Sequence, residues 1–152
     1  MKSVFPKLNS IKILELSEQI EVRVRFSEVD SLKIVWHGHY AKYFEDAREA
    51  FGIKYGLGYL DVYSKGYVTP LVELNFEYKK SLFYNDKAIV KTTYVDSKAA
   101  KIIFKYEVIN AKSKELIAIG QSTQVFLTSE NPELQLIIPD FFENWKKKWG
   151  LI

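Results

Sequence analysis

A short segment, residues 27–40, gathers the side chains best suited to chemistry. It contains Asp30 and both histidines of the chain, His37 and His39, and it leads into the start of a predicted helix. Helix N-termini carry free N–H groups and a partial positive charge, so they stabilise an oxyanion or bind a phosphate. A carboxylate beside such groups acts as a nucleophile or as a general base on water, and a histidine there donates a hydrogen bond or moves a proton. This segment is therefore the first candidate for a reacting centre.

The length and composition are those of one globular domain. The chain has 152 residues, of which 47% are hydrophobic and 27% charged, and a domain of this size buries a core without disulfide or metal staples. It contains no cysteine, which excludes disulfide scaffolds, cysteine nucleophiles, cysteine-ligated zinc and iron–sulfur clusters. The net charge of +3 does not require nucleic acid, although it suits an anionic ligand such as a phosphate. We therefore expect no metal, no cofactor and no nucleic-acid partner.

Neither a targeting signal nor a membrane segment is predicted. The charged start of the chain is not followed by the apolar region of a signal peptide. No apolar run approaches the roughly 20 residues that cross a bilayer. We expect a cytoplasmic protein without a membrane span.

The candidate segment is predicted to join a strand to a helix. Residues 20–26 alternate between apolar and charged side chains, which is typical of a half-buried strand. From residue 39 to residue 51, apolar residues recur with the spacing of one helical face. They are Tyr40, Tyr43, Phe44, Ala47 and Phe51. The glycines expected to end this helix are Gly52, Gly56 and Gly58.

The rest of the chain predicts four more strands and a short helix. The strands cover residues 68–78, 87–95, 101–109 and 115–127. Because their connections are short, we expect them to form an antiparallel meander. The tail places four aromatic side chains on one helical stripe, which is expected to pack the last helix onto the domain. They are Phe141, Phe142, Trp145 and Trp149.

This order of elements predicts an α+β domain. One long helix and one antiparallel sheet both bury their apolar faces if the sheet wraps around the helix, which is the plan of the hotdog fold. We expect a single domain over residues 1–152, with a lead-in or arm at 1–19, the hotdog core at 20–128 and the C-terminal helix at 139–150.

Three stretches of the sequence resemble the 4-hydroxybenzoyl-CoA thioesterase family of hotdog acyl-CoA thioesterases. The first follows the family pattern T-D-x-x-G-V-V-Y-H-x-x-Y and then F-E-x-A-R on the helix. It reads Val29-Asp30-Ser31-Leu32-Lys33-Ile34-Val35-Trp36-His37-Gly38-His39-Tyr40, followed by Phe44-Glu45-Asp46-Ala47-Arg48. Residues 74–86 are similar to the pattern V-x-Y-x-x-P-x-x-x-G-D, and residues 119–127 to the final strand. The resemblance covers about residues 20–128.

The resemblance implies roles for the residues at matching positions. Asp30 matches the catalytic carboxylate, which attacks the thioester carbonyl or activates a water against it. The backbone N–H of His37 matches the group that polarises this carbonyl, and its side chain would orient the thioester or assist the leaving thiolate. Candidates for the acyl pocket are Val35, Trp36, Tyr40 and Thr69, and candidates for contacts to the CoA phosphates are Lys79 and Lys80. The family also implies a homodimer or homotetramer with the site between two subunits.

Four positions depart from the family pattern. Lys33 replaces the glycine before the two apolar residues, and Val29 replaces the usual threonine before the aspartate. Ser81 and Asn85 stand where the second motif has proline and glycine. A glycine lets backbone and ligand approach closely. We therefore expect Lys33 either to crowd the acyl group or to favour an anionic group on it.

Each assigned residue also has a plainer interpretation. Asp30 could act only as a helix N-cap or a turn residue, because aspartate is common before helices. His37 could serve as a capping or packing histidine, and His39 is more simply explained in that way. Glu45 is expected to pair with Arg48 in an ordinary helix ion pair, although some hotdog thioesterases carry their acidic residue on the helix. The Lys79–Lys80 pair could belong to a solvated turn.

Three functions stay open from the sequence. The leading one is hydrolysis of an acyl-CoA or aryl-CoA thioester, or of an acyl carrier protein thioester. The others are a hotdog dehydratase acting on a 3-hydroxyacyl thioester and a non-catalytic module that binds acyl thioesters. The short interval between Asp30 and His37, both before the helix, favours hydrolysis over dehydration.

Overall fold

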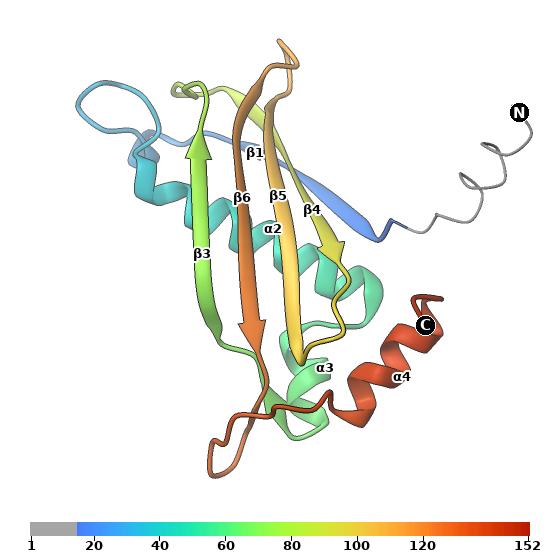
Figure 1. Cartoon of the computed structure of the whole chain (residues 1–152). Coiled ribbons are helices and arrows are strands. Elements are labelled where there is room, and N and C mark those ends of the chain that lie inside the picture. The colour runs from blue at the N-terminus through green and yellow to red at the C-terminus, as the bar shows by residue number, and fades with distance from the viewer. Residues whose placement is uncertain (1–14) are drawn as a thin grey trace, which may run out of the picture.

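An antiparallel sheet of five strands packs against one long helix, α2 (Tyr40–Tyr55), in the computed structural model, which describes residues 15–152 (Figure 1). The strands are β1 (Ser17–Arg23), β3 (Leu71–Tyr78), β4 (Lys87–Val95), β5 (Lys101–Asn110) and β6 (Leu116–Val125). This is the α+β arrangement predicted from the sequence. Strand β1 begins three residues earlier than expected, inside the predicted lead-in, and the part of that lead-in before residue 15 lies outside the described chain.

Shorter elements complete the domain. They are the single turns η1 (Phe26–Glu28) and η2 (His37–His39), the helices α3 (Tyr59–Ser64) and α4 (Asp140–Lys148), and the paired strands β2 (Tyr67–Val68) and β7 (Leu127–Thr128). Helix α3 was not anticipated from the sequence. Over residues 15–152, no helix has the length and apolar character needed to cross a bilayer.

The prediction of a four-strand meander is wrong for β3. Strands β4, β5 and β6 are neighbours in sequence order, but β3 pairs with β6 at the far edge of the sheet. The connection 79–86 therefore spans three strand spacings, about 14 Å, which eight residues cover easily. The vacated position beside β4 is taken by β1, where Ser17 pairs with Thr93. This order leaves β3 with one unpaired edge.

Helix α2 sits on the sheet through a close contact at its middle. The ring of Phe44, which is fully buried, stacks on Tyr106 of β5 with ring centroids 4.4 Å apart. It also lies directly over Gly120 of β6, where a Cβ would come within 2.3 Å of the Phe44 ring. The helix continues past Gly52 and ends at Gly56, whose φ of 73° suits the left-handed cap that glycine adopts readily.

Helix α4 closes the other end of α2. The indole N–H groups of Trp145 and Trp149 both donate to the Tyr55 carbonyl, at 2.8 and 3.1 Å. Phe142 and Trp145 are buried, which confirms the predicted packing of the aromatic stripe. Lys146 is buried as well, with its ammonium 3.0 Å from Asp96. The end of α2 near residue 55 is thus occupied by structural contacts, and the end near residue 40 faces the candidate segment (Figure 1).

We expect Gly120→Ala to destabilise the fold. The added methyl group would also lie 2.6 Å from the Asn75 carbonyl oxygen, so either α2 or β3 has to move. Overpacking of this kind costs about 1–3 kcal/mol, which denaturant unfolding measures. Gly58→Ala is a matched control, because φ there is an ordinary −78° and the nearest atom, at 3.3 Å, is an oxygen of the flexible Asp61 side chain, which needs only a small shift that keeps its hydrogen bond from the Gly58 N–H. Equal stabilities of the two variants would contradict this account.

Candidate active site

Asp30 lies in a tight turn that is closed on itself. Val29 and Val35 form a bridge across the base of the turn, and the Asp30 N–H donates to the Ile34 carbonyl at 2.9 Å. One carboxylate oxygen of Asp30, Oδ1, accepts a hydrogen bond from the Leu32 N–H at 2.8 Å. This is a local turn stabilised by an aspartate side chain, and it fixes the direction in which the carboxylate points.

The interpretation of Asp30 as a turn residue is confirmed, and its interpretation as a helix N-cap is wrong. Neither η2 nor α2 begins with a side-chain cap, so Asp30 does not satisfy their first N–H groups. Only one of its two oxygens is used in the turn, and within residues 15–152 Oδ2 makes no hydrogen bond or ion pair. Asp30 is partly exposed, so this second oxygen remains available to a ligand.

Lys33 occupies its position for a backbone reason. Its φ is 68°, in the left-handed region, and its N–H donates to the Asp30 carbonyl at 2.8 Å. A glycine adopts this conformation without strain, whereas other residues adopt it at a cost of about 1–3 kcal/mol. The side chain of Lys33 is exposed. The backbone of this turn thus accounts for the family glycine without any approach of a ligand.

The helix start beside this turn presents a backbone N–H. In the described part of the chain, the His37 N–H donates to no protein group, as expected for the first residue of a helical turn. The His37 carbonyl accepts a hydrogen bond from the Tyr78 hydroxyl at 2.8 Å, which fastens this start to the end of β3. The Trp36 ring covers Gly38, where a Cβ would come within 2.4 Å of the indole. The imidazole of His37 is exposed, with its centroid 5.2 Å from the Trp36 ring.

Glu28 is a site residue that our sequence reading missed. It is 7% exposed, and its Oε1 accepts hydrogen bonds from the Tyr43 hydroxyl at 2.7 Å and from the Arg25 N–H at 2.9 Å. Its Oε2 lies 3.0 Å from Nε2 of His39. Burial raises the pKa of Glu28, but the hydrogen bonds from Arg25 and Tyr43 and the nearby His39 outweigh it, so the pKa lies below its ordinary value. A carboxylate two residues before Asp30, where the strand alternation stops, was the available signal.

The residues predicted to form the acyl pocket fall into two groups. Trp36 is half exposed at the helix start, whereas Val35 and Tyr40 are buried beneath it. The pKa of Tyr40 is raised to about 12, mainly by burial and to a smaller extent by the neighbouring Tyr78. Thr69 lies apart, because it lines a cavity of about 320 Å³ with Glu45 and Arg48 from the middle of α2 and with residues 57–59. One chain therefore does not bring Thr69 to the same site as Asp30.

Arg48 and Glu45, both on α2, have partners within the chain. The guanidinium donates to the Tyr106 hydroxyl at 2.9 Å, and that hydroxyl is 2.6 Å from Oγ of Ser122. The other terminal nitrogen of the Arg48 guanidinium lies 3.9 Å from the Glu45 carboxylate, which confirms the predicted helix ion pair. His39 is likewise a packing residue, with its ring edge-on to Tyr43 at 5.1 Å. The group best placed for chemistry is therefore Asp30 with the His37 N–H.

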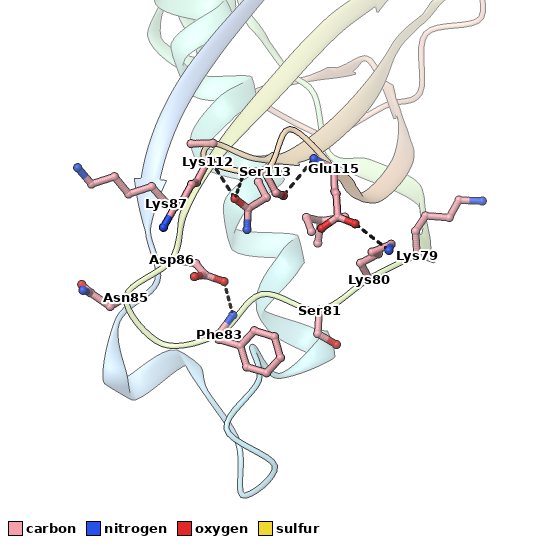
Figure 2. Close-up of a pocket in the computed structure, with 13 residues that line it drawn as sticks. Lys79, Lys80, Ser81, Phe83, Asn85, Asp86, Lys87, Lys112, Ser113 and Glu115 are labelled. Carbon is pink, nitrogen blue, oxygen red and sulfur yellow. Dashed lines mark hydrogen bonds and ion pairs between the residues drawn. The ribbon is translucent and has the colours of Figure 1, made fainter.

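Lys79 and Lys80 line a hollow of about 990 Å³ between the connection 79–86, with the first residue of β4, and the turn 110–115 (Figure 2). Both ammonium groups already contact a carboxylate. Lys79 contacts Glu77, and Lys80 lies 2.8 Å from Glu115. The hydrogen bond and charge of Glu115 raise the pKa of Lys80. Two further lysines of the hollow, Lys87 and Lys112, have no carboxylate within 4 Å among the residues placed by the structure.

The hollow adjoins the turn that carries Asp30. The carbonyl of Leu82, in the connection 79–86, accepts a hydrogen bond from the Val35 N–H at 2.9 Å, and Phe83 forms a bridge with Ile34. A ligand that occupied the hollow would therefore lie against the same loop that supports the Asp30 turn.

The fold and this site match a known family. The sequence pattern of the family described as the thioesterase-like superfamily matches residues 24–145, which include the turn, the helix start and all strands of the sheet except β1. The chain belongs to the thioesterase-like superfamily. The predicted resemblance is thus confirmed.

Relatives of this superfamily member agree in sequence and structure. It is 30% identical over 130 residues to YneP of Bacillus subtilis (strain 168), whose name assigns it provisionally to the acyl-CoA thioesterases; the match covers 84% of this chain and 94% of that one. The DHNA-CoA thioesterase of Staphylococcus aureus superposes with a TM-score of 0.77 at 30% identity, over 89% of this chain and 92% of that one. The 4-hydroxybenzoyl-CoA thioesterase of Pseudomonas sp. strain CBS-3 superposes with a TM-score of 0.71 at 22% identity, over 84% and 97%. The predicted hotdog fold is confirmed.

Proposed function

We propose that this superfamily member is a thioester hydrolase that cleaves an acyl-CoA or aryl-CoA to the free acid and CoA. One observation carries the proposal. Oδ2 of Asp30 and the backbone N–H of His37 both lack a hydrogen-bond partner among residues 15–152, and they lie on two segments that hydrogen bonds hold together. The relatives named above as thioesterases support the reaction class. A cytoplasmic location, where acyl-CoA is made and consumed, is part of this proposal.

The chemistry needs little more than these two groups. Oδ2 of Asp30 attacks the carbonyl carbon, or removes a proton from a water that attacks it. The carbonyl electrons move to oxygen, and the His37 N–H stabilises the resulting negative charge. When the carbonyl re-forms, the carbon–sulfur bond breaks and the thiolate leaves. In the nucleophilic route, water then hydrolyses the acyl-aspartate, so both routes end in acid and thiol.

We propose further that the site is shared between two copies in a homodimer. Strand β3 has one unpaired edge, and its apolar residues Leu71, Val72 and Tyr78 are exposed. Such an edge invites pairing with another strand. Two β3 strands paired antiparallel about a two-fold axis would place the start of one beside the end of the other. Thr69 of the second copy would then approach Tyr78, the residue that holds the His37 carbonyl.

The acyl pocket would then combine Trp36 from one copy with Thr69 from the other, and the buried ring of Tyr40 would support Trp36 from within the domain. These are aromatic and small polar contacts, which suit a flat aryl group or a fatty acyl chain. A thioester on an acyl carrier protein is the alternative, since one relative, from Arabidopsis thaliana, carries the name of an acyl-acyl carrier protein thioesterase.

The CoA nucleotide is proposed to occupy the hollow in Figure 2. Its volume falls within the range of about 300–1,000 Å³ that is usual for small-molecule sites. Lys79, Lys80, Lys87 and Lys112 supply the positive charge that phosphates require. Lys79 and Lys80 would exchange a carboxylate partner for a phosphate on binding.

The variant Asp30→Asn distinguishes the role of Asp30 in the turn from its proposed role in the reaction. The amide oxygen of asparagine still accepts the Leu32 N–H, so we expect unchanged thermal stability. The amide neither attacks a thioester nor takes a proton, so kcat for thiol release should fall by at least about 100-fold. A panel of acyl-CoA and aryl-CoA thioesters with a thiol reagent measures this. Full activity of the variant would refute the assignment of Asp30, and a wild type that releases thiol from none of them would favour the binding module.

Lys80→Ala should raise KM for an acyl-CoA by about two- to tenfold and leave kcat unchanged, because an exposed cation–phosphate contact contributes only modestly. The same variant should hydrolyse the matching acyl-pantetheine thioester, which lacks the nucleotide, as the wild type does. Lys147→Ala, on the exposed face of α4, is the control. Equal effects on both substrates would place the nucleotide elsewhere.

Val72→Asp should convert a dimer to a monomer. Val72 is 59% exposed on the free edge of β3, and a charge there opposes strand pairing. Light scattering after gel filtration should give twice the chain mass of 17.7 kDa for the wild type and that mass for the variant, with thiol release lost. A wild-type monomer that hydrolyses thioesters would exclude the shared site.

A further inference from the structure

Glu28 is the most deeply buried acidic side chain near the candidate site, and the mechanism above gives it no role. Burying a carboxylate is costly unless hydrogen bonds compensate for the lost water. All of its partners lie in the two segments that carry the reacting groups. The Arg25 N–H belongs to the approach to the turn, and His39 and the Tyr43 hydroxyl belong to η2 and the first turn of α2.

The backbone of Glu28 joins the same two segments. Its carbonyl accepts a hydrogen bond from the Trp36 N–H at 2.9 Å, so residues 28 and 36 face each other at the base of the Asp30 turn. Asp30 follows Glu28 by two residues, and His37 follows Trp36 by one. The side chain then holds this base against α2 through Tyr43, which is itself buried at 2% exposure.

We propose that Glu28 is a positioning residue of the active site, whose carboxylate ties the Asp30 turn to the start of α2 and so sets the place of Asp30 relative to the His37 N–H. The inference rests on the proposed function, because it assigns Glu28 a part in the reaction of Asp30. Glu28 touches no substrate in this account. Its effect arises because a reacting group displaced by about 1 Å loses up to about 100-fold in rate.

The scaffold requires this tie for a specific reason. The Asp30 turn is closed by its own hydrogen bonds, so it would keep its internal shape without Glu28. Those bonds do not fix the orientation of the turn against the helix, which depends on the backbone hydrogen bond from Trp36 to Glu28 and on the Glu28 carboxylate. The hydroxyl of Tyr43 and the ring of His39 reach it only through the Glu28 carboxylate.

The test compares Glu28→Ala, Glu28→Gln and the wild type for thiol release from an acyl-CoA that the wild type hydrolyses. For Glu28→Ala we expect kcat to fall by about 10- to 100-fold with KM within about twofold, because the turn persists while Asp30 is displaced. Glutamine keeps an oxygen that accepts from Tyr43 and from the Arg25 N–H, so kcat should return to within about threefold of the wild type. Because a partly unfolded enzyme also loses apparent kcat at unchanged KM, kcat is calculated per folded protein, with the folded fraction measured by circular dichroism.

A second pair of variants covers the case in which Glu28→Ala fails to fold. Tyr43→Phe removes only the hydroxyl that binds Glu28 and should lower kcat by about three- to tenfold. Tyr55→Phe is its matched control, because that hydroxyl binds the backbone of Ser17 at the far end of α2 and should leave kcat unchanged.

Two results would overturn the positioning role. Wild-type kcat in Glu28→Ala or in Tyr43→Phe would show that the tie does not matter, and a folded Glu28→Gln as impaired as Glu28→Ala would show that the charge itself takes part in the reaction. The rate of the wild type distinguishes a failure of the positioning role from a failure of the proposed function. A wild type that releases thiol, together with an unaffected Glu28→Ala, overturns the positioning role alone, whereas a wild type that releases none overturns both.

Discussion

The contact of Phe44 with Gly120 and Tyr106 sets the geometry on which the site depends. It fixes the height of α2 over the sheet, and the two ends of the helix then meet different surroundings. At the end near Tyr55, two tryptophans hold the last carbonyl, so the helix is anchored there. At the end near Tyr40, the helix start is held by Tyr78 and Glu28, and the His37 N–H donates to no group among residues 15–152. One end of α2 is therefore fully satisfied by the protein, and the other end keeps a free donor.

The fold class could be predicted from the sequence because the strand-like and helix-like spacings of apolar residues fall in different segments of this chain. Alternation in the strands and the helical spacing through Phe44 and Phe51 are local signals, and both survive in the structure. The place of β3 was missed, because strand order depends on which edges are compatible in space and not on connection length. The end of α2 was predicted only to within a few residues. Of the three glycines expected to end it, Gly52 stays inside the helix, and Gly56 is the one where the backbone turns left-handed.

The candidate site was predictable in part for the same reason. Asp30 and His37 stand in one motif, so the sequence alone was enough to group them. Glu28 was overlooked because its importance comes from burial and from partners such as Tyr43, 15 residues away, which no local pattern reveals. Thr69 shows the opposite case. The sequence grouped it with the helix start, yet within one chain it lines a separate cavity with Glu45 and Arg48 from the middle of α2.

Lys33 shows how the departures from the family pattern should be understood. If the family glycine served to let a ligand approach, a lysine would block the pocket. The left-handed φ of 68° at Lys33 gives a different reason for glycine, because the turn needs that backbone conformation whatever the side chain. The lysine adopts it at a cost in strain, and the two hydrogen bonds at Asp30, from Leu32 and Lys33, hold the turn in spite of that cost. The Lys33 side chain is exposed. The substitution therefore keeps the backbone conformation on which the Asp30 turn depends and adds a positive charge to the exposed surface of that turn.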